Sequence, residues 1–135
     1  AVRLEIWEVS RQLISEHPVS GIGIGRFQDL YEERASEILG HVPYEPSILH
    51  PHNLFLMFWL SSGLFGLAGF LWLLILFFVR FFSAIPEHRQ RIAAILFAMM
   101  IVILVHGLVD LPFWKNDLSY LFWLVFAGME RLRRP

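Results

Sequence analysis

The chain lacks cysteine and carries little charge. The absence of cysteine from all 135 residues excludes disulfides and thiolate metal sites. Charged residues make up 17% of the chain, and the net charge of −1 gives no reason to expect nucleic acid as a partner. Hydrophobic residues make up 56%, and the mean hydropathy is +0.56. A soluble domain of this length could not bury so much apolar surface, so the composition indicates a membrane protein.

Charge is missing entirely from residues 54–79. This run exceeds the roughly 20 apolar residues that cross a hydrocarbon core of about 30 Å. A second run, residues 92–109, is polar only at His106, and a third stretch, 118–129, is shorter and spans about 18 Å as a helix. We predict an all-α membrane protein with about three transmembrane helices (54–80, 92–109 and 117–131) in a domain covering 54–135. Because three helices make a small bundle, we expect them to belong to a larger polytopic bundle.

Residues 1–53 are the polar part, with four arginines and eight carboxylates. Apolar residues spaced three and four apart predict an amphipathic helix over residues 2–16. His17-Pro18 ends it, because the residue before proline is disfavoured in a helix. A second helix is predicted over 27–39, ending near Gly40, and residues 41–52 are predicted to be an irregular loop. We therefore expect residues 1–53 to be an extracytoplasmic helical loop.

The orientation follows from the basic residues. The loop 80–91 carries three arginines against one glutamate, and the residues after 129 carry three arginines against one glutamate. The positive-inside rule places both segments on the cytoplasmic side. Residues 1–53 and the short loop 110–117 are then expected to share the outer face.

His50-Pro51-His52-Asn53 stands immediately before the uncharged run. Asn53 is a good N-cap for the helix that follows. An imidazole at a helix start can act as a base near neutral pH, close to free backbone N–H groups and the positive end of the helix dipole. The alternative is an interfacial histidine that is hydrogen-bonded to backbone or water.

A second polar pair, His106 and Asp110, is four residues apart and shares a face of the predicted second membrane helix. The pair could line the same outer cavity as His52, but a pair that ties helices together is the interpretation we favour. His50, His52, His106 and Asp110 could in principle bind a divalent ion. We predict no metal and no cofactor.

Three short patterns follow one another along the chain. They are Arg-x-x-x-Trp at residues 3–7, Pro-x-x-Gly-x-Gly-x-Gly-x-Phe at 18–27, and His-Asn followed after nine residues by Gly-x-x-Gly at 52–66. Together they resemble the O-antigen ligase/O-antigen polymerase superfamily of bacterial membrane glycosyltransferases. The resemblance covers most of residues 1–80 and implies a C-terminal portion that lacks an N-terminal bundle and would be inactive alone.

The resemblance implies sugar transfer from a polyprenyl-pyrophosphate carrier, such as undecaprenyl pyrophosphate, at the outer face of the bacterial inner membrane. The acceptor by default is lipid A–core, in lipopolysaccharide biosynthesis. A growing glycan or a protein hydroxyl is the acceptor in other members. The expected partners are the lipid-linked glycan, the acceptor, the bilayer and the missing N-terminal helices. A rival interpretation is a non-catalytic polysaccharide exporter or scaffold.

His52 is the residue that we expect to act as base. Arginine binds phosphate through two parallel hydrogen bonds, so Arg3 is the expected pyrophosphate ligand, unless it merely faces solvent. Arg26 also starts an Arg-x-x-x-Leu pattern and is the alternative, while His50 and Asn53 are expected to support the site. The Gly-x-Gly-x-Gly run lacks the flanking strand of a dinucleotide site. We interpret it as a tight turn, and Gly63, Gly66 and Gly69 as positions of close helix packing.

Overall fold

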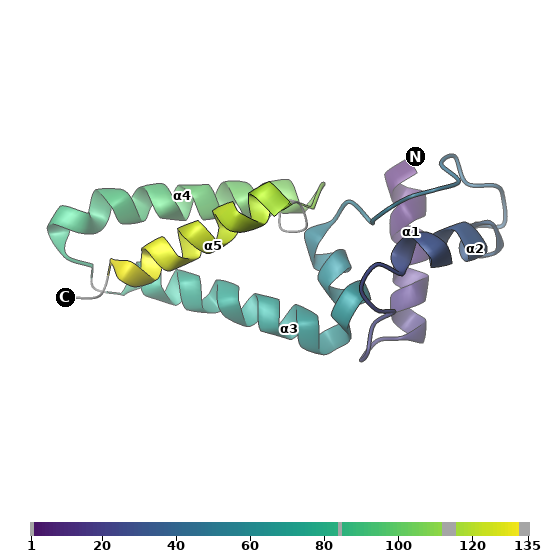
Figure 1. The fold of residues 1–135 in the computed structure, drawn as a ribbon, viewed down its shortest axis with the longest axis horizontal. Helices are drawn as coiled ribbons and strands as arrows, with labels where there is room; N and C mark the ends of the chain where they lie inside the picture. The colour runs from purple at the N-terminus through teal and green to yellow at the C-terminus, as the bar shows by residue number, and fades with distance from the viewer. Residues whose placement is uncertain (1, 84, 112–115, 133–135) are drawn as a thin grey trace. The chain divides into compact units, whose positions relative to one another are not determined.

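The computed structural model describes residues 2–83, 85–111 and 116–132, and every regular element within them is helical. The elements are α1 (Val2–Glu16), α2 (Phe27–Leu39), α3 (Leu54–Phe82), the short 3-10 helix η1 (Glu87–Arg89), α4 (Gln90–Gly107) and α5 (Asn116–Arg131) (Figure 1). This confirms the predicted all-α class. The chain forms two compact units, residues 1–69 and 70–135, here called the N-terminal and C-terminal units.

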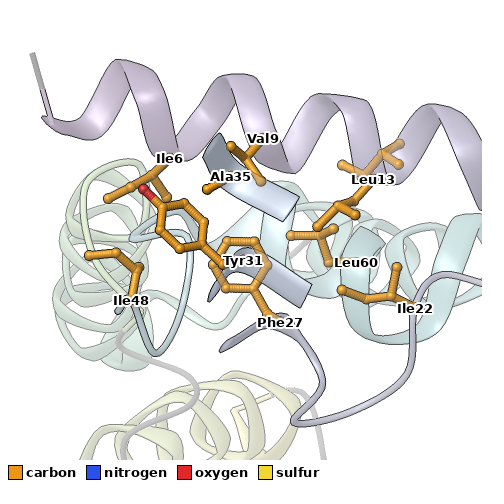
Figure 2. Close-up of a cluster of buried hydrophobic side chains, with 10 residues drawn as sticks. Ile6, Val9, Leu13, Ile22, Phe27, Tyr31, Ala35, Ile48 and Leu60 are labelled. Carbon is orange, nitrogen blue, oxygen red and sulfur yellow. The ribbon is translucent and has the colours of Figure 1, made fainter. Parts of the chain in front are cut away.

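The N-terminal unit has its own hydrophobic core between α1 and α2. Figure 2 shows side chains of α1 meeting Tyr31 and Ala35 of α2, with Leu60 of α3 beside Ile22. The buried members are Ile6, Val9, Leu13, Ile14, Ile22, Phe27, Tyr31, Ala35, Ile48 and Leu60. Because the apolar residues of α1 recur every three to four positions, they lie on one face and can pack together. The helices predicted over 2–16 and 27–39 are confirmed.

Local signals in the sequence set the ends of α1 and α2. Pro18 follows two residues after the end of α1. Gly40 caps α2 with a left-handed φ of 73°, and its N–H donates to the carbonyl of Ser36.

Arg34 of α2 pairs with Glu16 of α1 through both carboxylate oxygens. This hydrogen-bonded arginine is the main reason that the pKa of Glu16 falls from 4.5 to about 2. The pair is solvent-exposed, so it guides the angle between the helices more than it adds stability.

A close backbone contact between Gly21 and Gly63 holds α3 to the turn formed by residues 18–25, here called the 18–25 turn. Gly63 interrupts α3 with φ 66° and ψ −160°. The N–H of Leu64 donates to the carbonyl of Pro18 at 3.1 Å, and the N–H of Ile22 donates to the carbonyl of Leu60 at 2.7 Å. A Cβ on Gly63 would overlap the carbonyl of Val19. Close approach was predicted at Gly63, but a turn makes that approach rather than another helix.

The other two glycines of α3 differ from Gly63. A Cβ on Gly66 would collide with the side chain of Ser62, one turn earlier in the same helix, and a Cβ on Gly69 would meet no atom within 4 Å. The close-packing interpretation therefore fails at Gly69 in the described part of the chain.

Residues 54–69 belong to the N-terminal unit, whereas the predicted boundary between loop and membrane helices, after residue 53, stays a prediction.

The C-terminal unit packs residues 70–82 of α3 with α4 and α5. Its interior is rich in aromatic rings, with Phe77 and Phe122 almost fully buried. At one end of the unit the Nε of Arg80 donates to the carboxylate of Glu130 at 2.9 Å. The predicted third helix is observed as α5 (Asn116–Arg131). The predicted outer loop 110–117 and the basic residues Arg133 and Arg134 lie wholly or partly outside the described residues.

Two helical stretches among the described residues, Leu54–Phe82 and Glu87–Gly107, are long and apolar enough to cross a membrane. Only 22% and 28% of their most apolar windows are buried inside the structure. A core helix of a soluble protein would be mostly buried, whereas these helices expose large apolar side chains such as Trp72 and Val102. Such exposure is typical of helices that face lipid or further helices. α5, with 16 residues, is shorter than either stretch.

Gly63→Ala tests the contact with the 18–25 turn. Alanine pays about 1–3 kcal/mol for a backbone conformation that essentially only glycine adopts, and its Cβ also displaces the carbonyl of Val19. We expect a marked fall in the melting temperature of the intact protein in detergent. The matched control is Gly69→Ala, which has open space around it and should melt at or above the wild-type temperature. Equal melting of the two variants would contradict this account of Gly63.

Candidate functional site

The residues 50–53, here called the 50–53 loop, lie between α1 and the start of α3. Pro51 is buried, and its carbonyl accepts a hydrogen bond of 3.0 Å from the indole N–H of Trp7 on α1. At its other end the loop runs directly into α3 through Asn53. The loop is thus held on two sides, and its histidines project from a fixed backbone. Fixed positions of this kind are what a catalytic side chain needs.

Asn53 is the N-cap of α3, as the sequence predicted. Its side-chain oxygen accepts hydrogen bonds from the N–H groups of Phe55 (3.0 Å) and Leu56 (3.1 Å). Its own carbonyl accepts the first helical bond, from Met57. The cap uses two of the N–H groups that were expected to be free for an anion. An anionic substrate would therefore depend more on arginine and imidazole than on this helix end.

His52 has a left-handed backbone, with φ 48°, and it is the one described non-glycine residue with a positive φ. This region is sparsely populated by residues with a Cβ, although histidine enters it more readily than most. Conformations of this type cluster at functional sites, where the surrounding structure enforces them. The Trp7–Pro51 bond on one side and the Asn53 cap on the other enforce it here.

His50 and His52 lie next to each other. Their ring centroids are 4.4 Å apart, and the rings meet edge to face at 72°. Both side chains are half-buried. The structure therefore brings together His50, His52 and Asn53, three of the five residues that the sequence singled out. One histidine can orient the other, which suits a supporting role for His50.

The two candidate arginines occupy different elements. Arg3 lies on α1, one helical turn before Trp7 and therefore on the same side of the helix as the indole that holds the 50–53 loop. Arg26 is the residue that precedes α2, and its methylene groups lie beside Gly23. Both are exposed, and neither side chain makes a hydrogen bond or ion pair within the described part of the chain. Helix register thus connects Arg3, but not Arg26, to the 50–53 loop.

Sequence reasoning missed the role of Trp7. The tryptophan was recognised only as the last residue of Arg-x-x-x-Trp, yet its indole makes the bond to Pro51. The spacing itself held the signal, because positions i and i+4 of a helix share a face. An arginine and a tryptophan four residues apart on a helix therefore face the same neighbouring segment. Trp7 is a positioning residue, since it acts on the backbone that carries the histidines.

A buried carboxylate was also missed. Glu5 is 9% exposed and accepts a hydrogen bond from the N–H of Tyr44 at 3.1 Å. The imidazole of His41 lies 3.7 Å from its other oxygen. Glu5 therefore holds the irregular segment that leads to the 50–53 loop. Nearby, burial is the main cause that raises the pKa of Tyr31, with smaller contributions from the charges of Glu5 and Glu45.

His106 and Asp110 form a pair in the C-terminal unit. The Nε2 atom of His106 lies 3.3 Å from a carboxylate oxygen of Asp110. The sequence predicted that both lie on one helix, but α4 ends at Gly107. Asp110 lies in the turn that follows α4, and its backbone N–H donates to the carbonyl of His106. Within the described residues, no group of three or more histidine, aspartate or glutamate side chains could hold a metal ion.

Asn53→Ala tests the cap at the start of α3. Removing an N-cap side chain costs about 1 kcal/mol on average, whereas serine replaces asparagine with little loss. We expect Asn53→Ala to lower the free energy of unfolding of the intact protein by about that amount, and Asn53→Ser to retain most of it. Denaturant unfolding in detergent measures both. Equal stability of the alanine variant and the wild type would show that the cap contributes nothing.

Comparison with known proteins gives one family. The family model described as O-antigen ligase matches residues 1–71 of the 135-residue chain. No curated protein matches the chain, and no solved structure matches it. The matched segment contains α1, α2, the 50–53 loop and the start of α3, and therefore every candidate site residue in the N-terminal unit.

Proposed function

Since the chain belongs to the O-antigen ligase family, we propose that it transfers a glycan from a polyprenyl-pyrophosphate carrier to an acceptor hydroxyl. We propose lipid A–core first as the acceptor. The same chemistry on a growing glycan or a protein hydroxyl is the alternative. Two apolar helices and the family together indicate a membrane protein. We place it in the bacterial inner membrane with the 50–53 loop on the outer face.

The geometry of His52 supports this proposal best. Its imidazole stands on a left-handed backbone, next to His50, in a loop fixed by Trp7 and Asn53. A protein that only exported or bound glycan would have no need for a base fixed in this way. A general base must be positioned within hydrogen-bond reach of the proton that it removes. A backbone held from two sides keeps the imidazole in place for such a contact.

In the proposed reaction, His52 takes the proton of the acceptor hydroxyl as that oxygen attacks the anomeric carbon of the donor sugar. A new C–O bond forms to the acceptor, and the C–O bond to the pyrophosphate breaks. The electron pair of the broken bond leaves with the polyprenyl pyrophosphate, and the anomeric configuration inverts. General acid–base catalysis of this kind contributes about 10²–10⁴-fold to a rate.

Arginine stabilises the departing pyrophosphate in this proposal. A guanidinium offers two parallel N–H donors to phosphate oxygens and keeps its charge at every relevant pH. Arg3 is the first candidate because it lies on the side of α1 that holds the 50–53 loop. Its side chain is exposed and makes no ion pair within the described residues, so it can turn toward a ligand.

His52→Ala should abolish transfer by the intact protein. With the base removed, we expect the rate to fall by about 10²–10⁴-fold, measured in vitro with a polyprenyl-pyrophosphate glycan and lipid A–core. His50→Ala should lose less, because His50 only supports His52. Expression level and membrane insertion of both variants serve as controls. Normal transfer by His52→Ala would refute the base, and failure of the wild type with every acceptor while glycan still binds would favour the exporter.

Arg3→Ala and Arg26→Ala identify the arginine that binds pyrophosphate. A lost charge-assisted hydrogen bond costs about 1.5–3 kcal/mol, which corresponds to roughly 10- to 150-fold in affinity. We expect that loss of donor affinity for Arg3→Ala and little change for Arg26→Ala. Arg11→Ala, an exposed arginine two turns further along α1, is the matched control. The reverse result, with Arg26→Ala affected and Arg3→Ala unaffected, would transfer the role to Arg26.

A further inference from the structure

The first nine residues of α3 need no lipid around them. Leu54 and Leu60 are almost fully buried, and Met57 is 7% exposed. Leu60 belongs to the same hydrophobic cluster as the α1 and α2 side chains, and Leu56 and Trp59 pack against that cluster. The apolar character of residues 54–62, which predicted a membrane span, is thus used inside the N-terminal unit.

The length of α3 also exceeds what a span requires. As a straight helix its 29 residues would rise about 43 Å, whereas a hydrocarbon core is about 30 Å thick. The portion from Gly63 to the end of α3 has 20 residues and rises about 30 Å, which matches the core, with Arg80 near its far end, where a long arginine side chain can reach the headgroups. The surplus is therefore the segment before Gly63, the same segment that is buried against α1 and α2.

A patch of exposed apolar side chains surrounds the kink. Ile24 and Phe65 are 72% and 76% exposed, and Val19 and Leu64 are about half exposed. We call these four residues the kink patch. They come from the 18–25 turn and from α3, which the hydrogen bond from the N–H of Leu64 to the carbonyl of Pro18 joins.

Trp59, one turn before the kink, donates its indole N–H to the same Pro18 carbonyl at 2.9 Å. Tryptophan is enriched where a membrane meets water. Trp59 is therefore a second feature, besides the exposed apolar side chains, that is typical of the membrane–water interface.

We propose that the kink patch is a lipid-contact surface, and that α3 enters the hydrocarbon of the bilayer at Gly63 rather than at Asn53. Leu64 and Phe65 are the first residues of the helical stretch that follows the kink, so the bilayer that surrounds that stretch also meets them. Side chains of the 18–25 turn, fixed to that point of the helix, then dip into the same leaflet. Gly21, the first glycine of the Gly-x-Gly-x-Gly pattern, provides the close approach that this requires.

The 50–53 loop is consequently separated from the hydrocarbon by the segment 54–62. The segment 54–62 is about 14 Å long as a helix, and the headgroup layer on one side of a bilayer is about 5–8 Å thick. The separation along the chain therefore exceeds the thickness of that layer. This inference concerns the membrane boundary only, so it does not depend on His52 being a base.

Fluorescence quenching of the intact protein in lipid nanodiscs tests the boundary. Single cysteines at Ile24 and Phe65, in a background free of other cysteines, would carry an environment-sensitive dye. The matched control is Leu49→Cys, because Leu49 is 69% exposed and lies just before the 50–53 loop. The bilayer would contain lipids with a nitroxide quencher at a shallow acyl position.

We expect the dyes at Ile24 and Phe65 to shift to the blue and to lose most of their emission to the quencher. The dye at Leu49 should keep the emission of an aqueous dye and be quenched by iodide in solution. Quenching by lipid at Leu49 would place the boundary at Asn53 and overturn the proposal. A blue shift without lipid quenching at Ile24 and Phe65 would mean that protein covers the patch, which would also overturn it. So would aqueous behaviour of both dyes.

Discussion

The contact between Gly63 and the 18–25 turn is the constraint on which the N-terminal unit depends. Two backbones approach so closely there that a Cβ on either Gly21 or Gly63 would overlap main-chain atoms of the other segment. Hydrogen bonds from Ile22 and Leu64 then join the two segments. Because these bonds use main-chain groups, they fix the turn on α3 independently of the neighbouring side chains. The core between α1, α2 and α3 can close only around this contact.

The same arrangement gives the candidate site its geometry. With the 18–25 turn fixed on α3, α1 lies where Trp7 can hold the carbonyl of Pro51. That bond, with the Asn53 cap, sets the backbone on which His52 adopts its left-handed conformation. The three sequence patterns that are far apart in the chain therefore serve one purpose. One fixes the turn, one supplies the indole and the arginine, and one carries the imidazole.

Much of this structure could be predicted from the sequence. The period of the apolar residues indicated α1, Pro18 and Gly40 marked the ends of α1 and α2, and Asn53 was identified as a cap, because these signals act locally. The kink at Gly63 could not be predicted, since a glycine within an apolar run is equally compatible with a straight packed helix. Nor could the Trp7–Pro51 bond, which joins residues 44 positions apart. The apolar run 54–79 also could not be divided from sequence into a part that packs in a protein core and a part that spans the membrane, because burial in protein and burial in lipid favour the same residues.

Amide hydrogen exchange at Ile22 tests the central claim, that this backbone contact organises the unit, most directly. Ile22 lies in a glycine-rich turn outside any helix, yet its N–H donates to the carbonyl of Leu60 at 2.7 Å. Exchange is slow where opening requires the surrounding unit to unfold, and fast in a turn that opens by itself. We expect Ile22 in the intact protein to exchange as slowly as the core amides of α1 and α2. Exchange at the rate of an unprotected loop would contradict it.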